Sequence, residues 1–377
     1  MEPDMSQKID VGCYYFPNYH PGDKRNNEVH GPAWSEWNLV KNAVPRFPGH
    51  RQPKRPLWGY EDESDPAVMK KKIRTASEYG IDYFIFDYYY YDDGPFLEDC
   101  LDKGFLPAVK EEKLKFALMW ANHDWTDIHP CDHKSRPLLY PGTVTKENFV
   151  RITDEIIERY FKHPNYYAPD NKPYFSIYHL RKFINSLGGI EMAKKAITDF
   201  RFRVRKAGFS DLELNVILQR VPVLPGEGRE SEISVATDLG FDSTASYVWV
   251  HHVPLPKTCE MPYSDAMNGY FAEWDNIMKR CTIPYYPNVT VGWDPSPRTI
   301  ASDDWAPVGY PYSCTFSQNT PEAFQEALAK TKIRLEKEHI RTFSINCWNE
   351  WTEGSMLEPE AEYGMGYLEA VKNVFKQ

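Results

Sequence analysis

Short runs of apolar residues alternate along the chain with stretches in which apolar residues recur every three or four positions. The short runs have few polar interruptions and are rich in Val, Ile, Phe and Tyr, which is typical of strands buried on both faces. They predict eight strands, at residues 9–16, 81–88, 114–120, 173–178, 213–219, 241–247, 284–291 and 342–348.

The stretches between these runs have the period of amphipathic helices. They predict helices at residues 66–79, 95–112, 146–161, 189–207, 264–280, 321–338 and 367–375. Only the helix between the fifth and sixth strands is weakly marked, because residues 221–230 are rich in Pro and Gly. Strands that alternate with helices indicate a parallel sheet covered by helices.

Eight strand–helix repeats within 377 residues favour a (β/α)8 TIM barrel. A doubly wound open sheet is the alternative, but no predicted strand is followed by a Gly-rich phosphate loop. No linker or break in composition divides the chain, so residues 1–377 are predicted to form a single catalytic domain.

Long irregular segments follow the predicted strands, and they fall at residues 18–65, 123–142, 220–236, 248–263 and 293–320. Loops of this length inside a compact domain are usually functional. In a barrel they meet at the C-terminal face of the strands, where active sites are built. The sequence therefore predicts a site on that face.

Two carboxylates stand three residues apart directly after the last predicted strand, at Glu350 and Glu353. Trp348 and Trp351 flank them, and Gly354 closes the motif. Hydrolysis of a glycosidic bond uses a pair of carboxyl groups, and indole faces suit the apolar side of a sugar ring. In an extended strand the two carboxylates would face opposite ways, so the chain must turn between them. Gly354 tolerates the backbone angles of such a turn.

The other strand ends carry polar and aromatic side chains, as a neutral polyhydroxyl ligand requires. The candidate substrate-binding residues are Tyr14, Tyr15, Asp87, Tyr88, Trp120, Asn122, His123, His179, Tyr247, Trp293, Arg298, Trp348, Asn349 and Trp351. For four of them a structural role is an open alternative. Asp87 can cap a loop and Tyr88 can be a packing residue. Arg298 can hold a loop by a salt bridge, and His179 can be a core histidine.

The loop segment 123–133 contains three His, one Cys and three Asp. Its spacing matches no standard zinc pattern. We interpret these side chains as loop residues, or as substrate contacts in the case of His123 and Asp124. The sequence thus predicts neither a metal site nor a cofactor.

The net charge of −10 and the lack of a Lys/Arg run argue against nucleic acid as a partner. No apolar segment reaches the length of a transmembrane helix. The seven Cys include no C-x-x-C pair, which favours reduced thiols. Residues 1–10 lack the apolar core of a signal peptide. These features favour a cytoplasmic protein, with a periplasmic or cell-surface location as the alternative if a leader has been removed. The sequence carries no signal for oligomeric state.

Several motifs, taken in order, carry a resemblance to a known family. They are residues 14–20 (YYFPNYH), 48–53 (PGHRQP), 119–122 (MWAN), 292–294 (GWD) with Arg298, and 348–354 (WNEWTEG) followed by 357–359 (LEP). The chain resembles the WbsX-like family, which is similar to the endo-α-mannosidases of glycoside hydrolase family 99. This resemblance covers most of the chain and implies a (β/α)8 barrel. The WbsX-like name also comes with a glycosyltransferase label.

The mannosidases carry an Asn-Glu-Trp-x-Glu-Gly pattern, which places their first Glu on Glu350 and their second on Glu353. The resemblance implies that Glu350 deprotonates the sugar 2-hydroxyl, which attacks its own anomeric carbon. Glu353 then acts as general acid and later as base, giving retention through a 1,2-anhydro sugar. For this role Glu353 needs a raised pKa, to which Trp351 can contribute by excluding water. Thr352 departs from the mannosidases, which have His at this position.

The sequence therefore predicts a retaining glycoside hydrolase that acts on an oligo- or polysaccharide with Glu350 and Glu353. One alternative is a glycosyltransferase of polysaccharide synthesis, which would need a nucleotide or lipid-phosphate site. Another is a non-catalytic carbohydrate-binding protein, which would keep the aromatic residues without needing both carboxylates.

Overall fold

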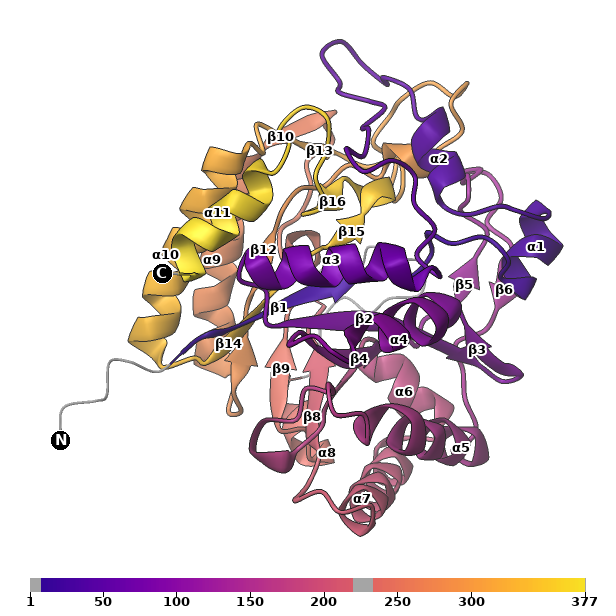
Figure 1. Cartoon of the computed structure of the whole chain (residues 1–377), viewed down its shortest axis with the longest axis vertical. Coiled ribbons are helices and arrows are strands. Elements are labelled where there is room, and N and C mark those ends of the chain that lie inside the picture. Colours follow the sequence, from indigo (N-terminus) through magenta and orange to yellow (C-terminus); the bar gives the residue numbers. More distant parts are fainter. Residues whose placement is uncertain (1–7, 220–232, 377) are drawn as a thin grey trace.

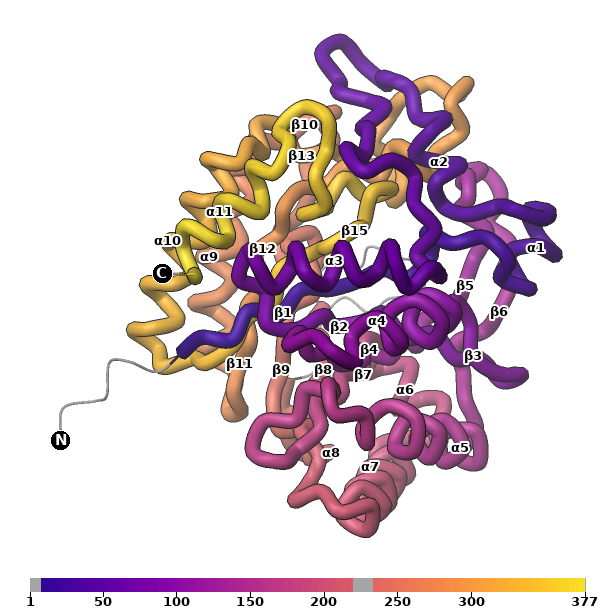
Figure 2. The backbone as a smooth tube through the Cα atoms, viewed as in Figure 1, coloured from indigo at the N-terminus to yellow at the C-terminus, as the bar shows by residue number. Residues whose placement is uncertain are grey.

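A ring of parallel strands lies at the centre of the computed structural model, which describes residues 8–219 and 233–376 (Figure 1 and Figure 2). The strands hydrogen-bond in the order β11-β9-β8-β7-β4-β2-β1-β14-β12. Their bounds are β1 Asp10–Tyr15, β2 Tyr83–Tyr91, β4 Lys115–Trp120, β7 Tyr174–Ile177, β8 Glu213–Ile217, β9 Ser243–Ala245, β11 Tyr285–Tyr286, β12 Asn288–Thr290 and β14 Thr342–Asn346. Every residue of β2 is buried, as expected for a strand with side chains on both covered faces.

The ring closes through the seventh predicted strand, which Pro287 divides into β11 and β12. β11 pairs with β9, and β12 pairs with β14, so the two halves join the ends of the sheet. Proline has no N–H to donate to a neighbouring strand, but the carbonyl of Pro287 accepts a hydrogen bond from the backbone N–H of Ser344 at 2.9 Å. The predicted (β/α)8 barrel is confirmed.

Helices surround the strands on the outside of the barrel (Figure 1). The long ones are α3 Pro66–Glu78, α5 Lys146–Ile156, α7 Ile190–Lys206, α9 Tyr263–Arg280, α10 Pro321–Glu338 and α11 Gly366–Phe375, close to their predicted bounds. Their starts follow from local sequence, since Asp65 and Thr320 cap α3 and α10 and a proline follows each cap.

Shorter helices complete the outer layer and the loops. They are α1 Lys24–His30, α2 Trp37–Asn42, α4 Leu106–Val109, α6 Leu180–Ser186, α8 Ile233–Leu239, the π-helical turns Cys100–Phe105 and Ile157–Phe161, and the 3-10 turns Pro169–Asn171, Trp249–His251, Ser296–Arg298 and Trp351–Glu353. The helix predicted at 95–112 begins late, because β3 Gly94–Phe96 pairs antiparallel with the end of β2. The Pro/Gly-rich stretch 221–230 lies outside the described residues.

Small sheets give structure to the long loops at the C-terminal ends of the strands. They pair β5 Trp125–Thr126 with β6 Leu138–Tyr140, β10 Glu260–Pro262 with β13 Thr315–Ser317, and β15 Asn349–Glu350 with β16 Ser355–Met356. Helices α1 and α2 belong to the loop that follows β1. These elements form the rim around the open end of the barrel (Figure 2).

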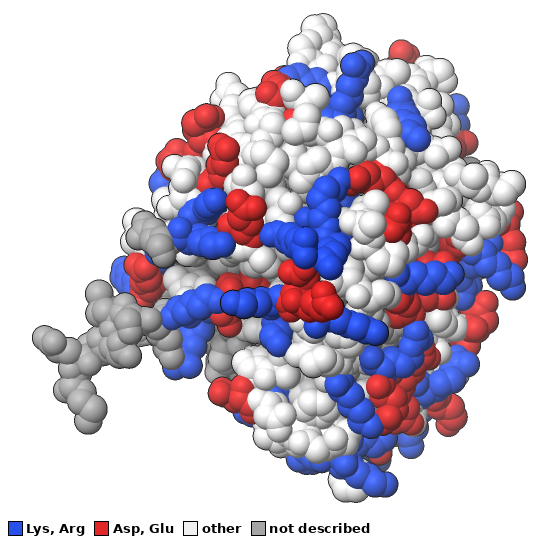
Figure 3. All heavy atoms as spheres, in the orientation of Figure 1, with Lys and Arg blue, Asp and Glu red and all other residues white. Residues whose placement is uncertain are grey.

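Acidic and basic side chains are intermixed on the face shown in Figure 3, without a single block of either sign. No helix among residues 8–219 and 233–376 is long and apolar enough to cross a membrane. All seven cysteines are free thiols.

Candidate active site

A cavity of about 70 Å³ lies at the C-terminal ends of the barrel strands. Its aromatic wall is formed by Phe16, Tyr89, Trp125, Tyr178, Tyr247, Trp293 and Tyr310. Three carboxylic side chains from the strand ends, Asp87, Glu350 and Glu353, face it together with Arg298. The cavity therefore combines flat apolar surfaces with groups that can exchange protons.

The turn predicted between the two glutamates is present. After β14 the chain forms β15, which ends at Glu350, and then the 3-10 turn Trp351–Glu353. Gly354 follows in the left-handed region with φ +66, where a Cβ would lie 2.7 Å from the Cβ of Asp294. Only glycine satisfies both the backbone angle and this close approach. The turn brings both carboxylates into one cavity.

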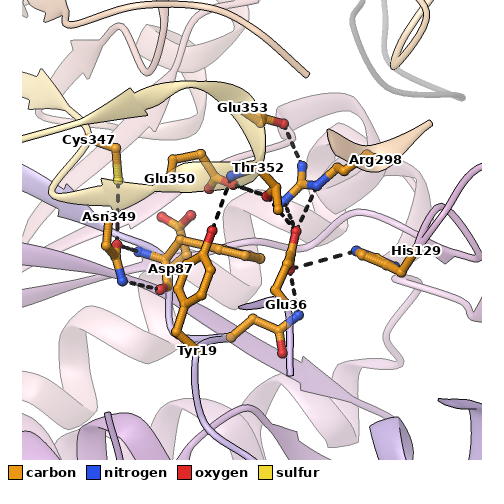
Figure 4. A network of polar contacts seen from close by, with 12 residues as sticks. Tyr19, Glu36, Asp87, His129, Arg298, Cys347, Asn349, Glu350, Thr352 and Glu353 are labelled. Carbon is orange, nitrogen blue, oxygen red and sulfur yellow. Dashed lines mark hydrogen bonds and ion pairs between the residues drawn. The ribbon is translucent and has the colours of Figure 1, made fainter. Parts of the chain in front are cut away.

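A single buried guanidinium binds three carboxylates. Arg298 donates to Glu350 from Nη2 at 2.8 Å, to Glu353 from Nη1 at 2.6 Å and to Glu36 from Nε at 2.8 Å. Figure 4 shows Arg298 between the two motif glutamates and Glu36. Tyr310 donates from its hydroxyl to Glu353 at 2.7 Å. Charge-assisted contacts of this kind fix the positions of both glutamates.

One cation for three buried carboxylates leaves an excess of negative charge, which the pKa values reflect. Burial raises the pKa of Glu350 well above its usual range, and burial also raises the pKa of Glu353, in each case against the opposing pull of Arg298. For Glu36 burial acts in the same direction, but Arg298 and the hydrogen bond from the Thr352 hydroxyl outweigh it, and the pKa is lowered. A proton is thus retained on the motif pair while Glu36 stays ionised.

Asp87 directs its carboxyl group from β2 into the same cavity. Tyr247 donates from its hydroxyl to Oδ2 of Asp87 at 2.9 Å, while the buried Oδ1 has no hydrogen-bond partner among the described residues. Burial raises the pKa of Asp87 well above its ordinary value. A buried polar atom without a partner is costly, so Oδ1 is suited to meet a ligand hydroxyl.

The structure brings part of the predicted site together. The predicted residues that line the cavity are Asp87, His123, Tyr247, Trp293, Arg298, Glu350 and Glu353. The others do not line it, for three separate physical reasons.

Strand alternation turns Tyr15, Tyr88 and Trp120 away from the cavity, which corrects their prediction as substrate-binding residues. Their neighbours in sequence line it instead, namely Phe16, Asp87, Tyr89, Met119 and Ala121. Successive side chains of a strand point to opposite faces. The hydroxyl of Tyr15 meets Sδ of Met69 at 3.3 Å, and the rings of Tyr88 and Trp120 pack on Tyr160 and Phe149 of the helical layer.

Tyr14, Asn122 and His179 also do not line the cavity, and they support its wall. Asn122 clamps the backbone of His179, with its Nδ2 donating to the carbonyl at 3.1 Å and its Oδ1 accepting from the N–H at 2.7 Å. His179 caps the start of α6. Tyr14 lies inside the barrel with its ring 4.6 Å from that of Tyr247.

Trp348, Asn349 and Trp351 anchor the glutamate turn and are not sugar platforms, so this part of the prediction is corrected. Both indoles are fully buried and donate to Glu358, Trp348 at 2.9 Å and Trp351 at 2.7 Å. Asn349 binds the backbone of Phe16, accepting from its N–H at 2.9 Å and donating to its carbonyl at 2.7 Å. The turn is thereby joined to the end of β1.

Glu358 in turn belongs to a buried ion triad outside the strands. Nζ of Lys72 in α3 lies 2.5 Å from Glu358 and 2.6 Å from Glu63. Burial opposes the charge of Lys72, but the two glutamates outweigh burial and raise its pKa. The triad links α3 to the two tryptophans that hold the glutamate turn.

Sequence analysis missed Glu36, His129 and Tyr310. Glu36 and Tyr310 lie in long loops without a motif, and nothing local signals that they meet Arg298. His129 lies 3.9 Å from Glu36. In contrast, Tyr89 lies two residues after Asp87 and therefore on the same face of β2. The two-residue alternation of a strand would have predicted that Tyr89 lines the site.

The closed parallel barrel thus carries buried glutamates and aromatic rings at the C-terminal ends of its strands. The chain belongs to the WbsX family, because the family model described as "Glycosyltransferase WbsX" matches residues 11–371. WxcX of Xanthomonas campestris pv. campestris, described as uncharacterized, is 25% identical over 375 residues. This match covers 96% of the chain and 48% of WxcX, so the chain spans about half the length of the curated relatives it matches.

Solved structures with the same barrel include glycosidases. The GH99 endo-alpha-mannosidase from Bacteroides thetaiotaomicron aligns with a TM-score of 0.60 at 14% identity over 98% of each chain. A glycoside hydrolase-like protein aligns with a TM-score of 0.62 at 14% identity, over 99% of this chain and 95% of the other. The beta-glucosidase from Thermotoga maritima aligns with a TM-score of 0.50 at 10% identity, over 98% and 97%. At these identities the likeness shows the fold, and it agrees with the resemblance found in the sequence.

Proposed function

We propose that the protein is a retaining glycoside hydrolase that acts on an oligo- or polysaccharide. The observation that carries this proposal is the placement of Glu350 and Glu353 on neighbouring nitrogens of the buried Arg298, within an aromatic-walled cavity. Two carboxyl groups that face one sugar site, with a proton retained on the pair, are what glycosidic bond cleavage requires.

Glu353 is the proposed general acid and base. Its raised pKa, caused mainly by burial of the carboxyl group, keeps a proton available to higher pH than in an ordinary carboxyl group. It gives this proton to the glycosidic oxygen as the bond to the anomeric carbon breaks. The resulting carboxylate then takes a proton from the water that attacks in the second step.

Glu350 is the proposed base for the first step. Burial raises the pKa of Glu350 and Arg298 opposes this effect, so Glu350 acts as a carboxylate when the proton of the pair is on Glu353. It removes the proton of the sugar 2-hydroxyl, whose oxygen attacks the anomeric carbon and forms a 1,2-anhydro sugar. Water opens this ring at the anomeric carbon while Glu350 returns its proton to the 2-oxygen, so two inversions give retention.

A glycosyltransferase is the second candidate, because the family description uses that word. A nucleotide or lipid diphosphate donor would need a cation for its phosphates. Arg298 is already bound by three carboxylates, and it is the only Lys or Arg among the described residues that line the cavity. The charge of the cavity therefore favours a neutral glycan over a diphosphate.

Product release from a broad glycan panel tests the proposal directly, with the wild type and Glu353→Ala compared side by side. We expect new reducing ends from the wild type only, with the anomeric configuration of the substrate retained in the first product. Transfer of sugar from a nucleotide or lipid donor without release would favour the transferase. Equal glycan binding by both proteins, without turnover by either, would favour a binding protein.

Tyr310→Phe should move the basic limb of the kcat/KM profile to higher pH. The Tyr310 hydroxyl donates to Glu353 at 2.7 Å and thereby lowers the pKa of that carboxyl against the effect of burial. Its loss raises the pKa further, so the protonated acid persists to higher pH, by about one pH unit for a hydrogen bond to a charged group. Tyr312→Phe is the matched control, since Tyr312 contacts Asp303 and not the glutamates. A limb that stays in place, or moves down, would contradict this role of Tyr310.

Glu36→Gln should move the same limb in the opposite direction. The negative charge of Glu36 raises the pKa of both motif glutamates. Glutamine removes this charge, so the positive charge of Arg298 acts more strongly on Glu350 and Glu353 and lowers their pKa values. Glu353 then loses its proton at lower pH. Glu28→Gln on the exposed side of α1 serves as control. A purely structural role for Glu36 would reduce kcat without moving the profile.

A further inference from the structure

Three side chains of types that can bind a metal ion lie together at the edge of the cavity, whose lining includes His129. His30 is the last residue of α1, while Asp127 and His129 follow β5 in another loop. One possible ligand atom from each lies within 4.8 Å of those from the other two. Figure 1 shows α1 beside β5 and β6, so segments about a hundred residues apart meet here.

We propose that His30, Asp127 and His129 bind a divalent transition-metal ion such as Zn²⁺. Two imidazoles and one carboxylate form a ligand set that such ions prefer, and three protein ligands leave positions open for water or a substrate hydroxyl. Two ligand atoms of a tetrahedral Zn²⁺ lie about 3.3 Å apart, so atoms within 4.8 Å of one another each need to move by under about 1 Å to close the site. The spacing within 123–133 fits no zinc pattern because His30 comes from a distant loop.

The state of His129 supports a ligand at this position. The residue is 3% exposed, and its Nδ1 has no hydrogen-bond partner among the described residues. A buried imidazole nitrogen without a partner is costly unless something binds it.

Indole rings hold both imidazoles in orientation. The ring of His30 stacks on Trp34 with centroids 4.2 Å apart, and the ring of His129 stacks on Trp125 at 5.2 Å. The centroids of the two imidazoles are 6.0 Å apart. This arrangement reduces the conformational entropy that metal binding would otherwise remove.

The site is connected to the catalytic network through the other nitrogen of His129. Nε2 lies 3.9 Å from Oε2 of Glu36, which in turn binds Arg298 (Figure 4). A metal on Nδ1 places the proton of the neutral ring on Nε2, directed toward Glu36. Metal-binding histidines commonly orient themselves toward a carboxylate in this way. The ion would fasten α1 to the β5–β6 loop and hold His129 against Glu36.

Metal binding is measured on the untagged chain after treatment with a chelator, by calorimetry with Zn²⁺ and by visible absorption with Co²⁺. We expect one ion per chain, with d–d bands for Co²⁺, and at least about tenfold weaker binding in His30→Gln and in Asp127→Asn. His133→Ala is the matched control from the same loop and should bind like the wild type.

No binding to the wild type, or unchanged affinity in both His30→Gln and Asp127→Asn, would overturn the proposal. Melting temperatures measured without metal distinguish the loss of a metal ligand from the loss of the folded structure. Both His30 and Asp127 are only half-buried. The measurement needs no glycan, so its outcome is independent of the proposed hydrolase activity.

Discussion

Glu353→Gln should lower kcat on the glycan that the panel identifies by about 10²–10⁴-fold, the usual contribution of general acid–base catalysis. Glutamine keeps the shape of Glu353 and can still meet Tyr310 and Arg298, but it carries no proton that the glycosidic oxygen can accept. Glycan affinity should change little, because the aromatic wall is unaltered. Steady-state kinetics and calorimetry with the same glycan measure the two quantities separately.

Glu362→Gln is the control for this experiment, since Glu362 lies on the surface with Arg51. It should retain wild-type turnover. Turnover by Glu353→Gln within about tenfold of the wild type would exclude Glu353 as the general acid. If Glu350→Gln abolished turnover while Glu353→Gln did not, the roles of the two glutamates would need to be exchanged.

Lys72→Met should destabilise the fold by about 3–5 kcal/mol, as expected when one partner of a buried ion network is removed. Nζ of Lys72 lies 2.6 Å from Glu63 and 2.5 Å from Glu358, and all three side chains are buried. Without this cation two carboxylates remain buried and uncompensated. Thermal and denaturant unfolding with no ligand present measure the loss.

Lys71→Met in the same helix is the matched control. Lys71 pairs with Glu61 at the surface, where its side chain is 38% exposed, so the free energy of unfolding should change by less than about 1 kcal/mol. Adding Glu358→Gln to Lys72→Met should recover part of the stability. If Lys72→Met and Lys71→Met melt alike, the triad does not support the fold.

The barrel could be predicted from sequence because its strands are marked locally. Strand β2 and helix α3, for example, follow from a continuous apolar run and from a capped amphipathic stretch. The division at Pro287 was less visible, because an apolar run shows neither where pairing stops nor which neighbour takes each half. Which strands pair depends on the closed ring as a whole, and a local run of sequence does not show it.

The site was only partly predictable, and the errors have physical causes. Glu350 and Glu353 were found because their chemistry and their turn are encoded within a few residues. Trp348 was assigned to the sugar because indoles beside carboxylates suit one, but its direction is set by Glu358. Glu36 meets Arg298 across 262 positions of sequence, and no local pattern reports such a contact.

The excess of carboxylates over cations in the cavity has a thermodynamic consequence for inhibitors. Burial raises the pKa values of Asp87, Glu350 and Glu353, and Arg298 is the only Lys or Arg among the described residues that line the cavity. A ligand with its own positive charge, such as a ring-protonated iminosugar, would supply the missing charge and displace protons into the buffer. The heat of its binding should then depend on the ionisation enthalpy of the buffer, whereas that of a neutral sugar of the same shape should not.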